Sequence, residues 1–221
     1  MKNEPAAALV LDFGGVITKT MFETHDQTEK ALGLAPGTLG WKGPFEPETD
    51  PLWQAMSRDE ITERDYWLRR AGEVGEIVGE KWDRMDAFVR RARGANPDAI
   101  MRPEALETIG KVRDKGLRLA ILSNELDLFY GPEFRGQLAF LDDFDVIVDA
   151  TYTNILKPDP RAYAFVTDAL SLAAEDCVFV DDRPGNVKGG VAAGMRSVQF
   201  DVLCPRSSFV EVLAHFGLTL D

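Results

Sequence analysis

The alternation of apolar runs with segments of helical period is the feature that most constrains how this chain can fold. Five short apolar runs predict buried strands: Ala7–Leu11, Leu117–Leu122, Asp145–Val148, Cys177–Val180 and Arg196–Phe200. Helices are expected between the last four, from Pro103 to the glycine at 116, over Pro160–Leu170 and over Pro184–Gly194. Strands that alternate with helices form parallel βαβ units, so the sequence predicts an α/β fold with an open parallel sheet covered on both faces.

The interval after the first predicted strand is far longer than the others. Roughly 90 residues separate that strand from the helix at Pro103, whereas a whole βαβ unit needs only about 30. Three segments in the interval have helical character, Thr24–Leu32, Arg58–Ala71 and Lys81–Ala92, while the Gly- and Pro-rich stretch Ala35–Pro51 predicts an irregular connection. We therefore expect residues 18–100 to form an inserted helical cap, and residues 1–17 and 101–221 to form the core.

The charge balance limits the kinds of partner. The chain has 37 acidic and 25 basic residues, a formal charge of −12, and such a surface repels phosphate backbones and anionic lipid. We expect a small-molecule substrate and no nucleic-acid or membrane partner, while the oligomeric state is not indicated. The longest apolar stretch near the N-terminus, Ala6–Leu11, is too short to span a membrane and lacks the charged start of a secretion signal, so a cytoplasmic location is expected.

Three carboxylates follow two of the predicted strands. Asp12 comes directly after the first strand, and Asp181 and Asp182 come directly after the fourth. The carboxyl ends of parallel strands meet at one edge of the sheet, where clustered carboxylates repel one another unless a cation neutralises them. Oxygen ligands favour a hard ion such as Mg²⁺. The alternative is that each aspartate only caps a following helix or loop, which aspartate does well.

The other strand ends add polar groups of different kinds. Ser123 and Asn124 follow the second strand, and Lys157 follows the third. Taken singly, the first two could be a helix N-cap and the lysine a solvated loop residue. Taken in order, the carboxylate, the hydroxyl and amide, the lysine and the acidic pair predict one site beyond the carboxyl edge of the sheet.

These motifs, in this order, resemble those of the haloacid dehalogenase (HAD) superfamily, a group made up mostly of phosphatases. The matching motifs are Asp12-Phe13-Gly14-Gly15-Val16, Ser123-Asn124, Lys157-Pro158, and Asp181-Asp182 with Asn186. The resemblance spans nearly the whole chain and implies a Rossmann-like sheet in the order 5-4-1-2-3 with a C1-type helical cap. The segment Asp59–Trp67 is similar to the cap helix of the subfamily IA-like branch that includes sugar-phosphate phosphatases and the phosphatase domain of soluble epoxide hydrolase.

The resemblance also implies an activity, a cofactor and a role for each residue. It implies a Mg²⁺-dependent hydrolase of small phosphate monoesters that works through an aspartyl-phosphate on Asp12. The implied catalytic residues are Asp12, Lys157 and Asp181; the implied substrate-side residues are Ser123, Asn124 and Asn186; the implied Mg²⁺ ligands are Asp12, the Gly14 carbonyl and Asp182. In this scheme Lys157 neutralises nucleophile and phosphate, and Asp181 and Asn186 orient their neighbours.

One position departs from the phosphatases of the superfamily. These commonly carry an aspartate two residues after the nucleophile, which protonates the leaving oxygen, but here the residue is Gly14. Positioned proton transfer typically contributes about 100- to 10,000-fold to the rate. We therefore expect a substrate with a good leaving group, such as an anomeric sugar phosphate or an acyl phosphate.

Three other readings of the site stay open. Dehalogenases of the superfamily also lack the second acid, but they work without metal and carry uncharged residues near the position of Asp181-Asp182. Phosphonatases also have a small residue at the position of Gly14, but they need a cap lysine, for which only Lys42 and Lys81 are candidates in the insertion. A weakly active phosphate-binding module is the third reading.

Overall fold

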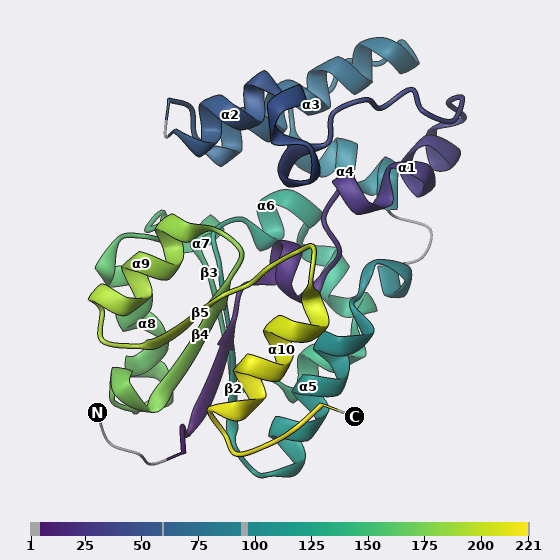
Figure 1. Ribbon diagram of the computed structural model, residues 1–221. Coiled ribbons are helices and arrows are strands. Elements are labelled where there is room, and N and C mark those ends of the chain that lie inside the picture. The colour runs from purple at the N-terminus through teal and green to yellow at the C-terminus, as the bar shows by residue number, and fades with distance from the viewer. Residues whose placement is uncertain (1–4, 59, 94–96, 221) are drawn as a thin grey trace. The chain divides into compact units, whose positions relative to one another are not determined.

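The computed structural model describes residues 5–58, 60–93 and 97–220, which form two compact units (Figure 1). Unit 1 comprises Met1–Lys19, Met101–Asp127 and Arg135–Asp221, and unit 2 comprises Thr20–Ile100 and Leu128–Phe134. The short segment Leu128–Phe134 groups with unit 2, although both of its flanking segments belong to unit 1. The core and cap boundaries expected from the sequence stay a prediction.

Unit 1 contains a five-stranded parallel sheet. Its strands are β1 (Ala8–Leu11), β2 (Arg118–Ser123), β3 (Val146–Asp149), β4 (Cys177–Asp181) and β5 (Arg196–Gln199). Their spatial order is β3-β2-β1-β4-β5, and every neighbouring pair is parallel. This confirms the predicted fold class and strand order. Leu11 pairs with Ile121 on one side and Val180 on the other, so the residues that follow these three strands emerge at one edge.

Four helices cover the sheet: α5 (Pro103–Asp114), α8 (Pro160–Leu170), α9 (Pro184–Ala192) and α10 (Pro205–Ala214). Each begins with a proline, whose missing N–H is not needed at the first helical position. In Figure 1, α8 and α9 lie on one face and α5 and α10 on the other. The sequence analysis did not predict α10. The shorter elements that follow β2 in the chain are α6 (Leu126–Tyr130), α7 (Ala150–Thr153) and the 3₁₀ segments Pro132–Gln137, Ala139–Asp143 and Ala174–Asp176, and of these residues Leu128–Phe134 belong to unit 2.

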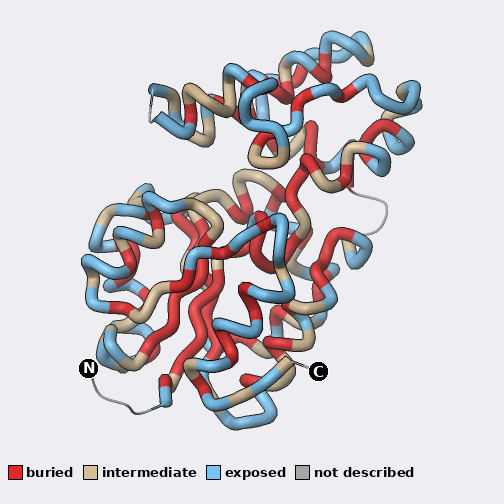
Figure 2. The backbone as a smooth tube through the Cα atoms, in the orientation of Figure 1, coloured by how far each residue is buried: buried red, intermediate tan, exposed pale blue. Residues whose placement is uncertain are grey.

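The interior of unit 1 is closely packed. The four residues of β1 are fully buried, and Figure 2 shows the central strands β2, β1 and β4 as mostly buried. A Cβ on Gly190 of α9 would lie 2.7 Å from Phe179 Cδ1 of β4, so only glycine allows this close approach of helix and sheet. Cys177 is buried at the start of β4, as expected, and burial raises the pKa of its thiol to about 11.

Unit 2 is helical. Its helices are α1 (His25–Leu32), α2 (Pro51–Ser57), α3 (Glu63–Val78) and α4 (Met85–Arg93), with 3₁₀ turns at Phe22–Thr24, Gly43–Phe45, Pro47–Thr49 and Pro97–Ile100. The three predicted helical segments correspond to α1, α3 and α4. Helix α3 begins later than predicted because Thr62 and Asp65 form a reciprocal capping box at its start. Asp59, the first residue of the segment that resembles a cap helix, lies outside the described residues.

Helix α2 was not predicted, because its first residue, Pro51, was read as the end of an irregular connection. Asp50 is the N-cap of this helix and accepts a hydrogen bond from the Trp53 amide at 2.9 Å. The same carboxylate accepts hydrogen bonds from Arg70 Nη2 at 2.6 Å and from the Tyr66 hydroxyl at 2.8 Å. Asp50 therefore ties α2 to α3 through a buried ion pair.

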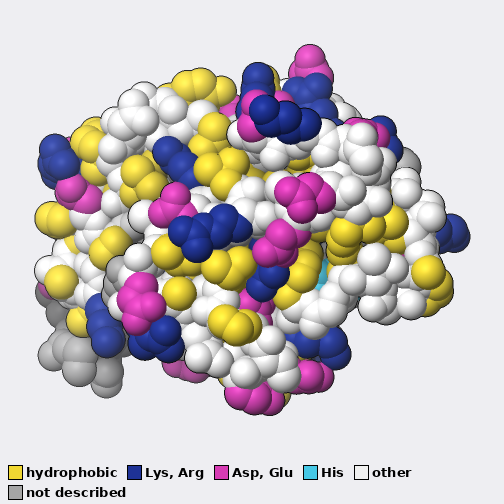
Figure 3. Space-filling model, turned by 90° about the horizontal axis from the view of Figure 1, so that it is seen from above, with side chains coloured by type: hydrophobic (Ala, Val, Ile, Leu, Met, Phe, Trp, Pro, Cys, Tyr) yellow, Lys and Arg dark blue, Asp and Glu magenta, His cyan; other side chains and the backbone are white. Residues whose placement is uncertain are grey.

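Among the described residues, no helix is both long enough and apolar enough to cross a membrane. On the face drawn in Figure 3, acidic and basic side chains are interspersed with apolar ones rather than gathered by sign.

Candidate active site

Lys157 lies between two of the predicted carboxylates. Its Nζ is 2.7 Å from Asp12 Oδ1 and 2.6 Å from Asp181 Oδ2. The side chains of Lys157 and Asp181 are 1% and 0% exposed, whereas that of Asp12 is 14% exposed. Asp12 is the first residue after β1, and its amide donates to Val180 O at 2.9 Å, which extends the pairing of β1 with β4. Of the three side chains, Asp12 is therefore the one that a substrate could reach.

The environment keeps Lys157 charged. Burial alone would lower the pKa of its ammonium, but the coulombic attraction of Asp12 and Asp181 and the hydrogen bonds to both outweigh burial and raise the pKa above its usual value. Lys157 is therefore a fixed cation and a poor candidate for proton transfer near neutral pH. It can neutralise negative charge beside Asp12.

Asp181 is held on all sides. Asn186 Nδ2 lies 3.1 Å from both carboxylate oxygens, and the Arg183 amide donates to Oδ1 at 2.8 Å. The Tyr163 hydroxyl in turn donates to the backbone carbonyl of Asn186 at 2.6 Å. Because its oxygens are occupied by donors, Asp181 is suited to orient Lys157. The sequence analysis missed Tyr163, whose place on the buried face of α8 resembles that of any core residue.

Asn124 contacts the backbone of Lys157 in both directions. The Lys157 amide donates to Asn124 Oδ1 at 2.7 Å, and Asn124 Nδ2 donates to Lys157 O at 3.2 Å. This reciprocal pair links the end of β2 to the loop that carries the lysine. Ser123, the last residue of β2, is buried, and its Oγ accepts a hydrogen bond of 3.4 Å from the Glu125 amide. Contact of Ser123, Asn124 and Asn186 with a substrate stays a prediction.

A tight turn follows Asp12. Gly14 has φ −74° and ψ 124°, and Gly15 has φ 82° and ψ −27°, a left-handed conformation that favours glycine. A Cβ added at Gly14 would meet no atom within 4 Å. The turn itself therefore does not exclude a larger residue from position 14, and the missing acid is not a steric necessity.

The carboxylates of the site fit a divalent cation. One carboxylate oxygen from each of Asp12, Asp181 and Asp182 lies within 4.8 Å of the other two. Among the described residues, this is the group of potential metal ligands that was found. Three carboxylates with one ammonium leave a formal charge of −2, which a hard divalent ion bound through oxygen would neutralise. Asp12 and Asp182, both partly exposed, could hold such an ion. The Gly14 carbonyl as a further ligand stays a prediction.

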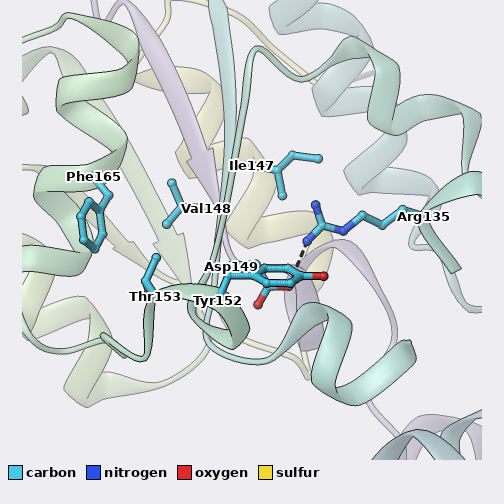
Figure 4. Close-up of a pocket in the computed structure, with 7 residues that line it drawn as sticks. All are labelled: Arg135, Ile147, Val148, Asp149, Tyr152, Thr153 and Phe165. Carbon is cyan, nitrogen blue, oxygen red and sulfur yellow. Dashed lines mark hydrogen bonds and ion pairs between the residues drawn. The ribbon is translucent and has the colours of Figure 1, made fainter. Parts of the chain in front are cut away.

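A separate hollow lies beside β3 (Figure 4). It has a volume of about 280 Å³ and is lined by Arg135, Ile147, Val148, Asp149, Tyr152, Thr153 and Phe165. Arg135 pairs there with Asp127 at 2.7 Å and with Asp149 at 2.9 Å. None of the predicted site residues lines this hollow, so it is distinct from the carboxylate cluster.

Comparisons with known proteins agree with the motifs. A family model described as haloacid dehalogenase-like hydrolase matches residues 6–194. Phosphatase MT3486 from Mycobacterium tuberculosis is 29% identical, over 97% of this chain and 97% of its own length. (S)-2-haloacid dehalogenase 1 from Pseudomonas sp. is 30% identical, over 45% of this chain and 43% of its own.

A solved structure agrees at the level of the fold. The HAD-hydrolase YfnB from Bacillus subtilis is similar with a TM-score of 0.65 and 16% identity, over 89% of this chain and 87% of that one. The resemblance found in the sequence is confirmed, as is the expectation that the chain is an enzyme. The family match, which covers most of the chain, shows that it belongs to the haloacid dehalogenase-like hydrolases.

Proposed function

We propose that this protein is a Mg²⁺-dependent phosphatase of small phosphate monoesters that uses Asp12 as a covalent nucleophile. The observation that carries the proposal is the position of Lys157 Nζ, 2.7 Å from Asp12 and 2.6 Å from Asp181, inside a cluster of three carboxylates. One buried cation orients the partly exposed carboxylate of Asp12, and the remaining negative charge of the cluster suits a metal ion. The similarity to a mycobacterial protein named as a phosphatase over nearly the whole chain supports the same activity.

The proposed reaction has two displacements. A carboxylate oxygen of Asp12 attacks phosphorus, the ester P–O bond breaks, and the leaving group departs with its electron pair. Water then attacks the aspartyl-phosphate, releases inorganic phosphate and regenerates the carboxylate. Lys157 stabilises the charge on the transferring group, while Asn124 and Asp181 keep the lysine in place. When bound by Asp12, Asp182 and the Gly14 carbonyl, Mg²⁺ would supply further stabilisation of the phosphoryl oxygens.

Gly14 narrows the proposed substrates. The residue has no group that could protonate a leaving oxygen, so an alkoxide would have to leave without that help. Phosphates whose leaving group carries negative charge well, such as anomeric sugar phosphates, acyl phosphates or aryl phosphates, are therefore the preferred class.

The second candidate is a haloacid dehalogenase. Gly14 favours it, since a halide leaves unprotonated, and so does the partial similarity to (S)-2-haloacid dehalogenase 1. The acidic cluster opposes it, because three carboxylates with only Lys157 among them leave a negative charge that would destabilise a departing anion unless a metal ion were bound as well. A phosphonatase would need a cap lysine, and a phosphate-binding module would show no turnover.

One experiment separates the phosphatase from the dehalogenase and from the binding module. The purified protein is assayed with p-nitrophenyl phosphate in EDTA and after addition of Mg²⁺, and with 2-chloropropionate for release of chloride. We expect phosphate release that stops in EDTA and returns with Mg²⁺, and no release of chloride. Chloride release in EDTA would instead identify a dehalogenase, and no turnover of either compound would favour the binding module.

A further inference from the structure

The two-glycine turn after Asp12 depends on contacts with residues outside the turn for its conformation. Its dihedral angles at Gly14 and Gly15 are those of a type II turn, in which the central peptide joins the Gly14 carbonyl to the Gly15 amide. A peptide between two glycines can rotate at little steric cost, because neither residue has a Cβ. The direction of the Gly14 carbonyl must therefore be set by contacts with other residues.

Two buried side chains make such contacts with Gly15. The Gly15 amide donates to Thr18 Oγ1 in a long hydrogen bond of 3.4 Å. The Gly15 carbonyl accepts a hydrogen bond of 3.0 Å from Arg102 Nε, and the Arg102 amide donates to Ile17 O at 2.9 Å. Thr18 and Arg102 are 1% and 2% exposed, and an antiparallel bridge between Thr18 and Met101 brings the arginine beside the turn.

Helix formation does not explain an arginine at this position. Arg102 is the N-cap of α5, but its side chain makes no capping hydrogen bond. N-caps are usually small polar residues, and a cation at the N-terminus of a helix is disfavoured by the helix dipole. A charged side chain is also costly to bury. Arg102 instead lies 5.5 Å from the centre of the Phe200 ring and reaches the turn, which indicates a role there.

We propose that Arg102 is a positioning residue that, with Thr18, fixes the Gly14 carbonyl in the direction needed to bind the metal ion. In a trans peptide the N–H and C=O groups point in opposite directions, so anchoring the Gly15 amide on Thr18 aims the Gly14 carbonyl away from Thr18. The Gly15 carbonyl belongs to the next peptide, and its bond to Arg102 fixes the other side of Gly15, so that the backbone of the turn is held on both sides of this residue. The inference rests on the proposed function, in which the Gly14 carbonyl is a Mg²⁺ ligand.

The test measures Mg²⁺ binding without substrate, by isothermal titration calorimetry, alongside the midpoint of thermal unfolding. Loss of groups that orient ligands typically weakens metal affinity about 10- to 100-fold, and we expect a loss of this size for Arg102→Met. Arg102→Lys, which keeps a donor, should bind more tightly than Arg102→Met. The control is Arg135→Met, which removes ion pairs with Asp127 and Asp149 but does not touch the turn. It should unfold at a lower temperature and keep the wild-type Mg²⁺ affinity.

A second pair of variants keeps the test decisive if Arg102→Met fails to fold. Thr18→Val removes the hydroxyl acceptor with little change of shape, and Thr18→Ser retains it, so only Thr18→Val should weaken Mg²⁺ binding. Equal Mg²⁺ affinity in wild type, Arg102→Met and Thr18→Val would overturn the inference alone. If the wild-type protein bound no Mg²⁺, the proposed function would fail and the inference with it.

Discussion

Each unit of this protein contains a buried ion pair between a basic side chain and an aspartate, but the two are built differently. In unit 1, Lys157 is shared by Asp12 and Asp181, and Asp182 lies in the same cluster. In unit 2, Asp50 is fully buried and accepts hydrogen bonds from Arg70, Tyr66 and the Trp53 amide, and the Arg70 guanidinium lies over the rings of Trp41 and Tyr66.

The difference lies in charge and access. The unit 1 cluster has three carboxylates around one ammonium, and two of them, Asp12 and Asp182, are partly exposed. The Asp50 carboxylate of unit 2 is completely enclosed, and its donors come from the helices that it joins. The aspartate beside Lys157 is therefore within reach of a substrate, whereas the aspartate beside Arg70 is not, and the distances alone would not reveal this difference.

Substitution of Asp12 should give the largest effect, a loss of hydrolysis without a loss of stability, and so should distinguish the unit 1 cluster from the unit 2 cluster. Asp12→Asn removes the nucleophile, and we expect hydrolysis to fall by at least about 10,000-fold, the scale seen when a covalent nucleophile is lost. The fold should be kept, because Lys157 still pairs with Asp181. Steady-state rates with p-nitrophenyl phosphate measure the loss of hydrolysis, and circular dichroism melting curves measure whether the fold is kept. Turnover close to wild type in this variant would remove Asp12 from the proposed reaction.

The Asp50→Asn variant should show the reverse behaviour. It removes the buried one of the two carboxylates that pair with Arg70, and breaking a buried pair typically costs about 3–5 kcal/mol of unfolding free energy. Glu73→Gln is the matched control, because Glu73 pairs with the same arginine but is 46% exposed, and exposed pairs contribute about 0–1 kcal/mol. Urea unfolding of both variants gives the comparison. Equal losses would show that burial does not distinguish the two partners of Arg70.

Much of the site could be predicted because parallel sheets bring the ends of their strands together. Asp12, Asn124 and Lys157 follow three different strands and Asp181 ends a fourth, and each strand was visible as an apolar run. Arg102 could not be predicted, because its hydrogen bond to Gly15 joins positions far apart in the chain. The same holds for Tyr163, which looks like a core residue until its hydroxyl is seen to reach Asn186.

The fold was less predictable where a proline can either interrupt regular structure or begin a helix. Pro51 was read as part of an irregular stretch, yet it begins α2 because Asp50 provides the cap. The proline that begins α10 was likewise passed over, although Phe209, Val212 and Leu213 have helical spacing and are buried. In both cases the local sequence contains a helix signal, an N-cap before Pro51 and helical spacing after Pro205, which the prediction did not use.

Adding an acid to the site should sharpen its chemical assignment. Gly14→Asp places a carboxylate where a Cβ meets no atom within 4 Å and where φ is −74°, so the turn should tolerate it. If the carboxyl group reaches the leaving oxygen, hydrolysis of an alkyl phosphate such as glycerol phosphate should rise by about 100-fold or more, while aryl phosphates gain less. The ratio of kcat/KM for aryl and alkyl substrates measures this effect. Gly14→Asn has nearly the same shape without the acid, and an equal gain in that variant would contradict proton transfer.

The smallest expected effect is a pH dependence of stability that originates in unit 2. The His25 Nε2 lies 2.6 Å from the Trp41 carbonyl, which can only accept, so this nitrogen carries the proton, and Nδ1 is buried without a partner. Burial lowers the pKa of His25 below 6.5; the bond to Trp41 and the charge of Glu29 act against burial, while Lys42 and Arg70 act with it.

The sign of this effect follows from proton binding. Above pH 6.5 both the folded and unfolded states hold a neutral His25, but below it the unfolded state binds the proton first, so the unfolding free energy falls as the pH falls. The loss between pH 7.5 and 5.5 should stay below about 1 kcal/mol, because the ring is partly exposed. Urea unfolding of His25→Gln, whose amide can still donate to Trp41, should show a weaker pH dependence than wild type. His215→Gln is the control in unit 1, where burial also lowers the pKa of the histidine. If only His215→Gln reduced the pH dependence, the effect would originate in unit 1, and His25 would not be its source.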